Sequence, residues 1–386
     1  MPIGGNPIKK LVESEGVLPA AHKVANLLYS EEGRRIDLNE ISIRECFETF
    51  IGPVSEHFPN NRRGGFHVAP LQEATTSMAF SVVTGTVISR AVQAAYDSRP
   101  GILDNLVNVV NSSMRTERTA GFQAFSGIDE VPEGQEYPES TFVDRGVEVP
   151  EPPKRGAMIE ITDETVIFDQ TSQILQRATA LGTKMQLDRE AFGIRTIQDL
   201  TSYKGFYPLV TGVPTQTDVF RTVAAGTAWY NKSINTIATN ALQDWTDIDA
   251  AWQYWANTAK IADENGDPIL VNPTVLLVPY ALVSTALRIL GAYENRVVTG
   301  GNTTLSPNVL NQLGLNLTVL TSPYMNDTTT WYIGDFKAQY QERVIIPIQT
   351  LPIAPNGRRD IVAAFRVRRK SRVETLDDKF VLKNTA

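Results

Sequence analysis

The residue types that most often carry out chemistry are sparse in this sequence. Its three histidines, His22, His57 and His67, all lie in the first seventy residues, and no HxH or HxxxH spacing occurs among them. A metal site needs several donors that converge on one ion, so ordinary surface histidines are the favoured interpretation. The single cysteine, Cys46, lies on the apolar face of an expected helix. That position favours a buried small side chain over a reactive thiol.

Two acidic pairs, Asp163–Glu164 and Asp377–Asp378, have the residue type for general acid–base work. The first pair precedes a helical pattern, so we interpret it as the acidic first turn of a helix, where the dipole favours negative charge. The second pair is interpreted as a solvated turn. Gly300–Gly301 lacks the spacing of a phosphate-binding loop, and no serine stands with a histidine on a predicted strand-to-helix turn. The sequence therefore predicts no catalytic, cofactor-binding or metal-binding residue.

One dense run of cations lies near the carboxyl end of the chain. It contains Arg366, Arg368, Arg369, Lys370 and Arg372. Phe365, Val367 and Val373 alternate with these cations, so a strand here would have one apolar face and one positive face. A nucleic-acid contact is one interpretation of such a face. The favoured interpretation is a salt-bridge surface between subunits.

A polar segment from Thr119 to Pro153, rich in Pro, Gly and Glu, supplies the opposite charge. It predicts a two-stranded, largely solvated hairpin that cannot hold itself together alone in water, so we expect it to lie on another subunit rather than to be disordered. Its acidic residues are Glu133, Glu136, Glu139, Glu148 and Glu151. The candidate contact residues are Glu133, Glu136, Glu139, Val147, Val149 and Lys154 on this side, and Arg366, Arg368, Arg369 and Arg372 on the basic side. Such a heterologous contact can close into rings.

Length and composition restrict the class of protein further. The chain has 386 residues, more than one hydrophobic core usually organises, so two or more lobes are expected. A net charge of -7 argues against a general nucleic-acid binder, whose affinity comes mostly from clustered cations. One cysteine excludes an intramolecular disulfide and fits folding in a reducing cytoplasm. No apolar run approaches about 18 residues, so no membrane span is predicted.

The first seventy residues predict a helical arm whose partners lie on the body of the protein or on a neighbouring copy. Its first helix is interrupted at Gly16 and Pro19, and Asp37 is the expected N-cap of a second helix that ends at Gly52–Pro53. A longer helix is predicted from Leu71 to Tyr96.

The stretch from Met158 to Ile194 is the expected spine of the molecule. It begins as a strand, Met158–Thr162, and continues after Asp163–Glu164 as a long helix. An apolar stripe along about six turns is formed by Ile174, Ala178, Leu181, Met185 and Phe192. This arrangement indicates a mechanical role.

Strand and helix patterns then predict a compact α/β lobe from about Ile234 to Gly334. A helix is expected over Asp247–Ala262, and Thr274–Pro279 is an apolar run of strand length that should be buried on both faces. After this lobe the chain returns to β structure up to Val373.

This order of parts resembles the major capsid proteins of tailed bacteriophages, whose fold is named after the Hong Kong ninety-seven phage. The resemblance covers roughly Leu71 to the carboxyl end. The stretches that carry it are Val147–Asp169 running into Thr171–Phe192, then Pro273–Tyr280, Val319–Tyr324, Trp331–Asp335 and Asp360–Arg368.

The resemblance implies an α+β fold, the fold of the Hong Kong ninety-seven phage capsid protein, with four named parts. These are an N-terminal arm (1–70), a peripheral domain (71–118, 158–233 with the spine helix, and a β tail at 338–386), an extended β-hairpin loop (119–157) and an α/β axial domain (234–337). It further implies pentamers and hexamers of an icosahedral virion shell around double-stranded DNA, assembled in the cytoplasm of a bacterial host. Some relatives cross-link subunits through a Lys–Asn bond, but only Lys154 lies in this loop and no motif fixes its partner.

The partners implied by the resemblance are first of all other copies of the chain. A short arm that begins at Met1 favours an uncleaved subunit with a separate scaffolding protein. A portal, packaged DNA touched non-specifically on the inner face and a decoration protein complete the expected partners, with no cofactor and no membrane. Two alternatives stay open: the shell protein of an encapsulin-like bacterial nanocompartment, and a soluble α/β enzyme that uses the Ile234–Gly334 lobe.

Overall fold

The chain folds into two compact units, each assembled from three separate segments. The computed structural model describes residues 5–30, 41–53, 72–114, 117–120, 131–134, 136, 146–149, 151–168, 170–200, 205–207, 215–224, 233–257, 259–262, 268–292, 294–299, 302–307, 315–353 and 361–386. The first unit takes 1–100, 154–188 and 346–370, and the second takes 101–153, 189–345 and 371–386. Both units combine helices and strands, which confirms the predicted α+β class.

The helices of the first unit form its apolar core. They are α1 (Gly5–Glu15), α2 (Val17–Tyr29), α3 (Ile43–Phe50), α5 (Gln72–Asp97), α7 (Asp163–Ile167) and α8 (Thr171–Ile197), whose last turns belong to the second unit. The predicted interruption is confirmed at Gly16, but it is wrong for Pro19, which lies in the first turn of α2, where a missing backbone N–H is tolerated. The prediction of Asp37 as an N-cap is wrong, because the helix begins at Ile43 and the Ser42 hydroxyl accepts a hydrogen bond from the Glu45 amide at 3.1 Å. Asp37 itself lies outside the described residues.

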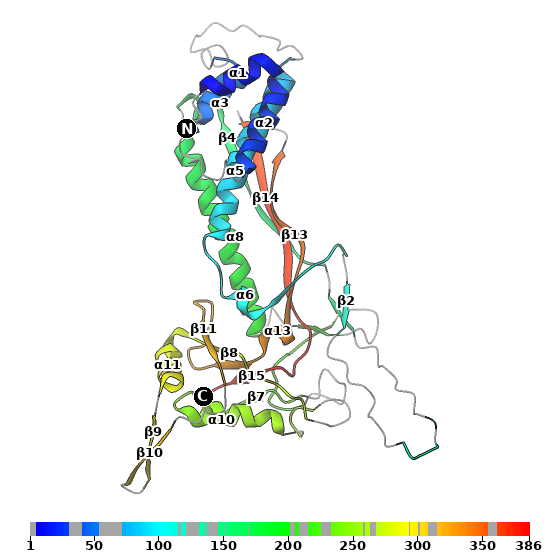
Figure 1. Ribbon diagram of the computed structural model, residues 1–386, viewed down its shortest axis with the longest axis vertical. Coiled ribbons are helices and arrows are strands. Elements are labelled where there is room, and N and C mark those ends of the chain that lie inside the picture. Colours follow the sequence, from blue (N-terminus) through cyan, green and yellow to red (C-terminus); the bar gives the residue numbers. More distant parts are fainter. Residues whose placement is uncertain are drawn as a thin grey trace. The chain divides into compact units, whose positions relative to one another are not determined.

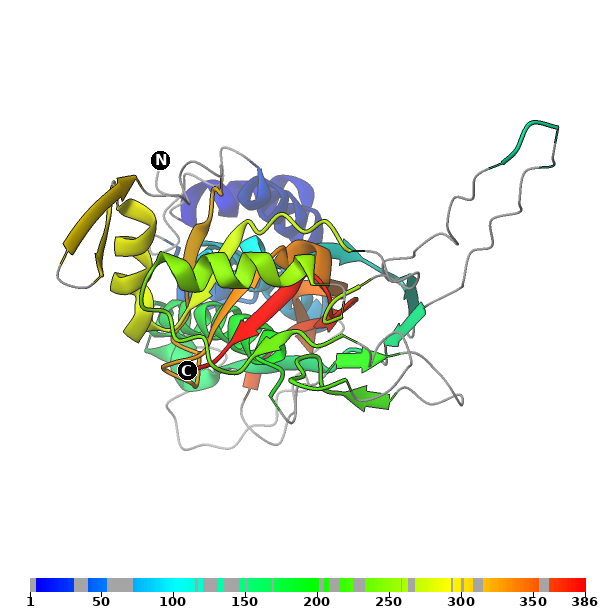
Figure 2. The same cartoon turned by 90° about the horizontal axis from the view of Figure 1, so that it is seen from below.

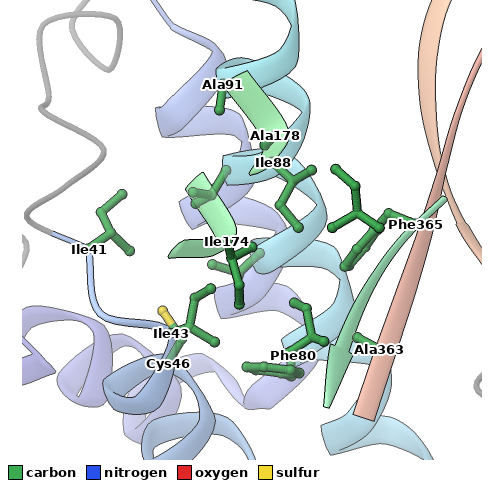
Figure 3. Close-up of a cluster of buried hydrophobic side chains, with 14 of the residues drawn as sticks. Ile41, Ile43, Cys46, Phe80, Ile88, Ala91, Ile174, Ala178, Ala363 and Phe365 are labelled. Carbon is green, nitrogen blue, oxygen red and sulfur yellow. The ribbon is translucent and has the colours of Figure 1, made fainter. Parts of the chain in front are cut away.

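The N-terminal helices pack against α5, so the body of the protein is the partner that the structure shows for this segment (Figures 1 and 3). Phe47 of α3 meets Phe80 of α5 edge-to-face, with ring centroids 5.5 Å apart. Cys46 is buried among these side chains, as its position on the apolar face of α3 predicts. Ile174 and Ala178 of α8, which lie about one hundred residues later in the sequence, complete the cluster (Figure 3).

Helix α5 is apolar because it is the central core helix of the first unit. Its segment Met78–Asp97 is long and apolar enough, by composition alone, to cross a membrane. Phe80, Val83 and Ile88 are each at most 1% exposed inside the cluster formed with α2, α3 and α8. Burial within the protein therefore accounts for its composition.

Strands β4 (Lys154–Thr162) and β14 (Ile361–Thr375) form an antiparallel pair in the first unit, with Ile159 opposite Phe365. Strand β13 (Tyr340–Ile353) pairs in parallel with β1 (Asn108–Asn111) through its first residues, and the sheet order is β1-β13-β14-β4. The predicted strand and long helix of the spine are present as β4 and α8, and Asp163 begins a helix as expected. That helix is the short α7, which ends at Ile167, so the expectation of one helix running on from Asp163–Glu164 is wrong: the long helix begins separately at Thr171.

A five-stranded sheet organises the second unit. Its order is β11 (Thr318–Thr321), β8 (Val275–Val278), β12 (Trp331–Gly334), β15 (Val381–Asn384) and β7 (Thr236–Ile237). Strand β8 is buried on both faces, as its continuous apolar run predicts. Leu276 and Val278 face a cluster with α10 (Trp245–Gln253) and α11 (Val283–Gly291), and Val275 and Leu277 face α6 (Leu103–Leu106), α13 (Phe336–Gln339) and the last turns of α8. Figure 2 shows α10 (yellow-green) lying across this sheet, with β15 (red) beneath it.

Two predictions for the second unit need correction. The chain end was expected to belong with the peripheral β tail, but β15 pairs with β12 and β7 inside the five-stranded sheet. Its Val381 and Leu382 are fully buried on opposite faces of this sheet. These apolar contacts place the end of the chain in the second unit, although it directly follows β14 in the sequence. The helix expected over Asp247–Ala262 begins earlier, after the capping box of Asp244, and ends at Gln253 before a single 3-10 turn (η3, Tyr254–Ala256).

The remaining short elements lie at the margins of the units. Two hairpins are β2 (Glu117–Ala120) with β3 (Gly146–Val149), and β9 (Glu294–Thr299) with β10 (Asn302–Pro307). The others are the pair β5 (Gly205–Tyr207) and β6 (Thr215–Thr217) and the 3-10 turn η4 (Tyr280–Leu282). The β2–β3 pairing confirms that the polar segment is two-stranded at its base.

Candidate assembly surface

Strands β4 and β14 have two chemically different faces because side chains alternate along a strand. One face carries Ile159, Ile161, Phe365 and Val367, which are all at most 6% exposed and belong to the core of the first unit. Residues directly opposite in the antiparallel register share a face. The other face therefore carries the even-numbered residues of both strands.

Arg369 lies on the core side of β14 rather than on its outer face. It is buried, and its guanidinium is 3.7 Å from the Asp188 carboxylate of α8. Arg155, which lies opposite Arg369 in the register, also pairs with Asp188 at 2.6 Å. Arg369 thus takes part in an ion pair within its own chain, which the alternation of Phe365 and Val367 alone did not indicate.

The outer face, here called the basic face, includes Lys154, Met158, Arg366, Arg368 and Lys370, together with the acidic residue Glu160. Lys370 lies directly opposite Lys154, and Arg366 lies opposite Met158. Lys154 and Arg366 are exposed, and Met158 is 51% exposed.

Arg368 lies between these cations and is partly buried. Its Nη2 donates to the Gln349 side chain of β13 at 3.3 Å, while its buried Nε has no acceptor among the residues that the structure describes. A shallow groove of about 530 Å³ runs beside β4 and is lined in part by Met158, Arg177 and Leu181. The basic face therefore presents cationic side chains beside a groove that also contains the Glu160 side chain.

The acidic side of the expected contact is described only in part. Glu133 and Glu136 are exposed. Val147 and Val149 lie in β3 opposite Thr119 and Glu117 of β2. Glu148 lies opposite Arg118 in the same pair, and Glu139 falls outside the described residues.

Arg372 lies in the second unit, apart from the segment that forms the basic face. It is part-buried near Glu374 and Arg343, and burial lowers the pKa of its guanidinium. Glu374 is the close partner of Arg343, at 2.8 Å, with both side chains at most 1% exposed. Arg372 thus belongs to the surroundings of an internal ion pair.

A second internal cluster centres on Arg189. Its Nε lies 2.9 Å from a Glu342 carboxylate oxygen, and its Nη2 lies 2.6 Å from Asp104. The Ser371 hydroxyl also donates to Glu342, at 3.0 Å. The sequence alone does not indicate this cluster, because its members share no local spacing. Asp104 and Ser371, for example, are 267 positions apart.

A third internal cluster surrounds Asp377 and Asp378, whose side chains are each at most 1% exposed. The interpretation of this pair as a solvated turn is therefore wrong. Both carboxylates are tolerated inside the second unit because Arg221 lies 2.8 Å from Asp378 and Lys379 lies 3.6 Å from Asp377, and each brings positive charge.

The described parts of the chain offer no metal centre, since no three His, Cys, Asp or Glu side chains converge there. His22 is exposed on α2, and His57 and His67 lie outside the described residues. What the described residues provide is a sheet face rich in cations and, elsewhere in the chain, the exposed carboxylates of Glu133 and Glu136.

The chain belongs to the phage capsid protein family. The sequence model of that family matches residues 147–384, which is more than half of the chain. The match includes β3, the spine helix α8, the five-stranded sheet and both strands of the basic face. No curated protein matches the chain.

Solved structures similar to this chain include shells from three sources. The capsid of Cyanophage P-SCSP1u has 10% identity and a TM-score of 0.46, with 75% of this chain and 88% of that chain covered. The virus-like particle from Pyrococcus furiosus has 12% identity and a TM-score of 0.42, with 77% and 97% covered. The encapsulin from Synechococcus elongatus PCC 7942 has 12% identity and a TM-score of 0.41, with 74% and 87% covered. The family assignment rests on the sequence match alone.

Proposed function

We propose that this chain is the major capsid protein of a tailed bacteriophage with the Hong Kong ninety-seven type of fold. Its copies assemble into pentamers and hexamers of an icosahedral shell that encloses double-stranded DNA. The observation that carries the proposal is the match to the phage capsid protein family over residues 147–384. The order of a β-hairpin, a long helix and a lobe with a five-stranded sheet supports the same conclusion. The role is structural, and the shell of the virion is its location after assembly in the host cytoplasm.

The contact between copies joins the acidic segment of one subunit to the basic face of the next. Glu133, Glu136 and Glu139 supply the negative charge, and Lys154 and Arg366 are exposed cations on the basic face. The exposure of Lys154 and Arg366 supports this assignment, because opposite charges on two surfaces steer their encounter. The contact is heterologous, and such contacts close into rings when the rotation allows it.

Electron microscopy of the purified protein tests the proposed function directly. Negatively stained particles and light scattering should reveal pentamers, hexamers or closed shells. A chain that stays monomeric across protein concentration, salt and pH would overturn the proposal. Particles from expressing cells, treated with nuclease, should retain protected DNA, whereas shells that hold protein cargo and no DNA would identify a nanocompartment of the encapsulin type.

Charge reversal tests the contact. The double substitution Lys154→Glu with Arg366→Glu should abolish or strongly weaken assembly and leave the subunit folded, because both side chains are exposed. Lys184→Glu, which reverses one exposed charge on α8, is the matched control and should assemble normally. Adding Glu133→Arg and Glu136→Arg to the double variant should restore assembly. Unchanged assembly of the double variant would show that the basic face is not the contact.

The other partners of the proposed shell follow from its assembly. A separate scaffolding protein and a portal guide closure, packaged DNA touches the inner face non-specifically, and a decoration protein is a further candidate partner. Affinity for DNA on such a face comes from phosphate contacts and should fall steeply as salt rises.

A further inference from the structure

Strand β4 is an edge strand in the part of the chain that the structure describes. It pairs with β14 on one side, and no described strand lies on its other side. An edge strand leaves a row of backbone N–H and C=O groups with which another chain can pair. With nine residues, Lys154–Thr162, β4 is longer than a typical strand and offers a long edge for such pairing.

The groove of about 530 Å³ beside β4 follows this edge. Its lining includes the consecutive residues 157–160, whose side chains alternate between the two faces of the sheet. A hollow that reaches both faces of one strand lies along the edge of that strand. Helix α8 contributes Arg177 and Leu181 to the same groove. Addition of a strand at an exposed sheet edge is a common mode of recognition, and this groove has the place and shape for it.

The middle of β4 is uncovered on both faces. Residues 156–158 are all exposed, whereas the next residue, Ile159, is buried. Ala157 lies directly opposite Val367, so the two share the core face of the pair. Val367 is 1% exposed, yet Ala157 is exposed. The core therefore ends at this point of the edge and leaves room for a second strand.

A second copy of β4 matches this edge in one antiparallel register. For two sheets to continue with their faces aligned, even-numbered residues must lie opposite even-numbered residues. A pair centred on Ala157 places Lys154 of one copy opposite Glu160 of the other, and two-fold symmetry repeats this opposite-charge pair. Met158 then lies opposite Gly156, which has no side chain to obstruct it.

The adjacent registers lack this complementarity. A pair centred on Met158 places Lys154 opposite Thr162. The same register places Glu160 opposite Gly156, so no opposite charges meet. A pair centred on Gly156 places Lys154 opposite Met158 and again leaves its charge without a countercharge. Charge therefore selects the register centred on Ala157.

We propose that β4 pairs with β4 of a second copy across a two-fold axis at Ala157, and that this contact joins neighbouring rings of the shell. The proposal rests on the proposed function in one respect: the contact of the acidic segment closes rings, and a shell also needs a contact between rings. Main-chain hydrogen bonds provide the affinity of an added strand, and side chains select its register. Charge reversal at Lys154 therefore weakens this pairing without abolishing it.

Disulfide trapping tests the symmetric pair. Residues directly opposite in an antiparallel pair have Cα atoms about 4.5–5.5 Å apart, a separation that a disulfide spans. Mild oxidation of assembled Ala157→Cys particles should therefore give a dimer on a non-reducing gel, and reduction should remove it. The wild-type chain, whose single cysteine is buried, provides the background.

Met158→Cys is the matched control, because this residue is exposed on the same strand. In the proposed register its two copies are offset by two residues, so their Cα atoms are about 7–8 Å apart, which is too far for a disulfide. This variant should give little dimer. A dimer through Met158→Cys and not through Ala157→Cys would overturn the proposed register.

Carbodiimide cross-linking tests the same register in the wild-type protein. Lys154 and Glu160 of one chain lie six positions apart on β4, or about 20 Å, so a direct amide bond between their side chains must join two copies. Mass spectrometry of assembled particles should find this link. Shells that form with neither the disulfide at position 157 nor this link would overturn the strand pairing and leave the proposed function in place. A chain that never assembles would overturn the proposed function, and with it a contact between rings.

Discussion

One buried ion pair and one buried hydrogen bond link strands β13 and β14 within the second unit. The Glu342 and Arg343 side chains of β13 meet Ser371 and Glu374 of β14, at 3.0 and 2.8 Å. Each pair replaces an apolar contact that sheets ordinarily use for register. Hydrogen-bonded partners are strictly required at such positions, because an uncompensated buried charge is far more costly than a missing methyl group.

The first prediction at this scale concerns Glu374. Glu374→Gln removes the carboxylate that neutralises the fully buried Arg343, so the free energy of unfolding should fall by about 3–5 kcal/mol. Asp104→Asn, which removes a partner of Arg189 that is 48% exposed, should cost only about 0–1 kcal/mol. Urea unfolding of both variants measures the difference. An equal decrease in the free energy of unfolding for the two variants would mean that burial does not determine how much each ion pair contributes to stability.

A second residue-level prediction concerns Asp327. Hydrogen bonds from Thr330 and Thr329 lower the pKa of its carboxyl to about 2. The lowered value gives stability that is present above the ordinary pKa of 3.8 and is lost as the pH falls through about 2. Solvent screens this exposed group, so Asp327→Asn should cost about 0.5–1 kcal/mol at neutral pH. Between pH 5 and 2, the unfolding temperature should therefore fall less steeply for the variant than for wild type, as thermal unfolding at several pH values will measure.

At the scale of elements, helices α5 and α8 approach closely because a glycine lies at their crossing. A Cβ added at Gly182 would lie 2.3 Å from the backbone oxygen of Val92 and 2.9 Å from the Ala95 Cβ. The backbone of Val92 cannot move away from this Cβ as the end of a flexible side chain could. Gly182→Ala should therefore force the helices apart and lower stability by about 1–3 kcal/mol, the usual cost of overpacking.

Gly291→Ala provides the control for that substitution. Gly291 is the last residue of α11, and nothing lies within 4 Å of a Cβ placed there. Alanine has a higher helix propensity than glycine, so this variant should be neutral or slightly stabilised. Thermal unfolding of the two variants separates steric clash from propensity, and a stable Gly182→Ala would contradict the close approach.

Elements with a local pattern were the ones that the sequence could predict. The stripe of Ile174, Ala178 and Met185 gives α8, and the unbroken run at Thr274–Pro279 gives a strand buried on both faces. Strand β15 could not be found in this way, because its four residues show no period and their burial depends on partners at β7 and β12. Whether such a short segment forms a strand depends on its pairing with distant segments.

The candidate surface was partly predictable for the same reason. Alternation of Phe365 and Val367 with cations correctly separates the two faces of β14. The inward position of Arg369 depends on Asp188, which lies 181 positions away, as the residue numbers 188 and 369 show. Likewise, burial of Asp378 depends on Arg221, which no local spacing connects to it.

At the scale of the whole molecule, the proposed function assigns the acidic segment to assembly rather than to the fold of the subunit. The base of this segment is the two-stranded pair of β2 and β3, and a two-stranded pair on its own has marginal stability in water. Its ordering in a shell would therefore come from contact with another copy.

Deletion of Gln135–Pro150 tests this separation of roles. The variant should keep the helical circular dichroism and the cooperative unfolding of wild type, because the deleted segment supplies none of the described helices and no strand of the two larger sheets. It should fail to form shells in electron micrographs, since the acidic side of the contact is gone. A version with a Gly/Ser linker of equal length keeps the connection without the charges, and should fail in the same way. If the subunit itself unfolds, the segment belongs to its core, and the assembly role proposed for it is wrong.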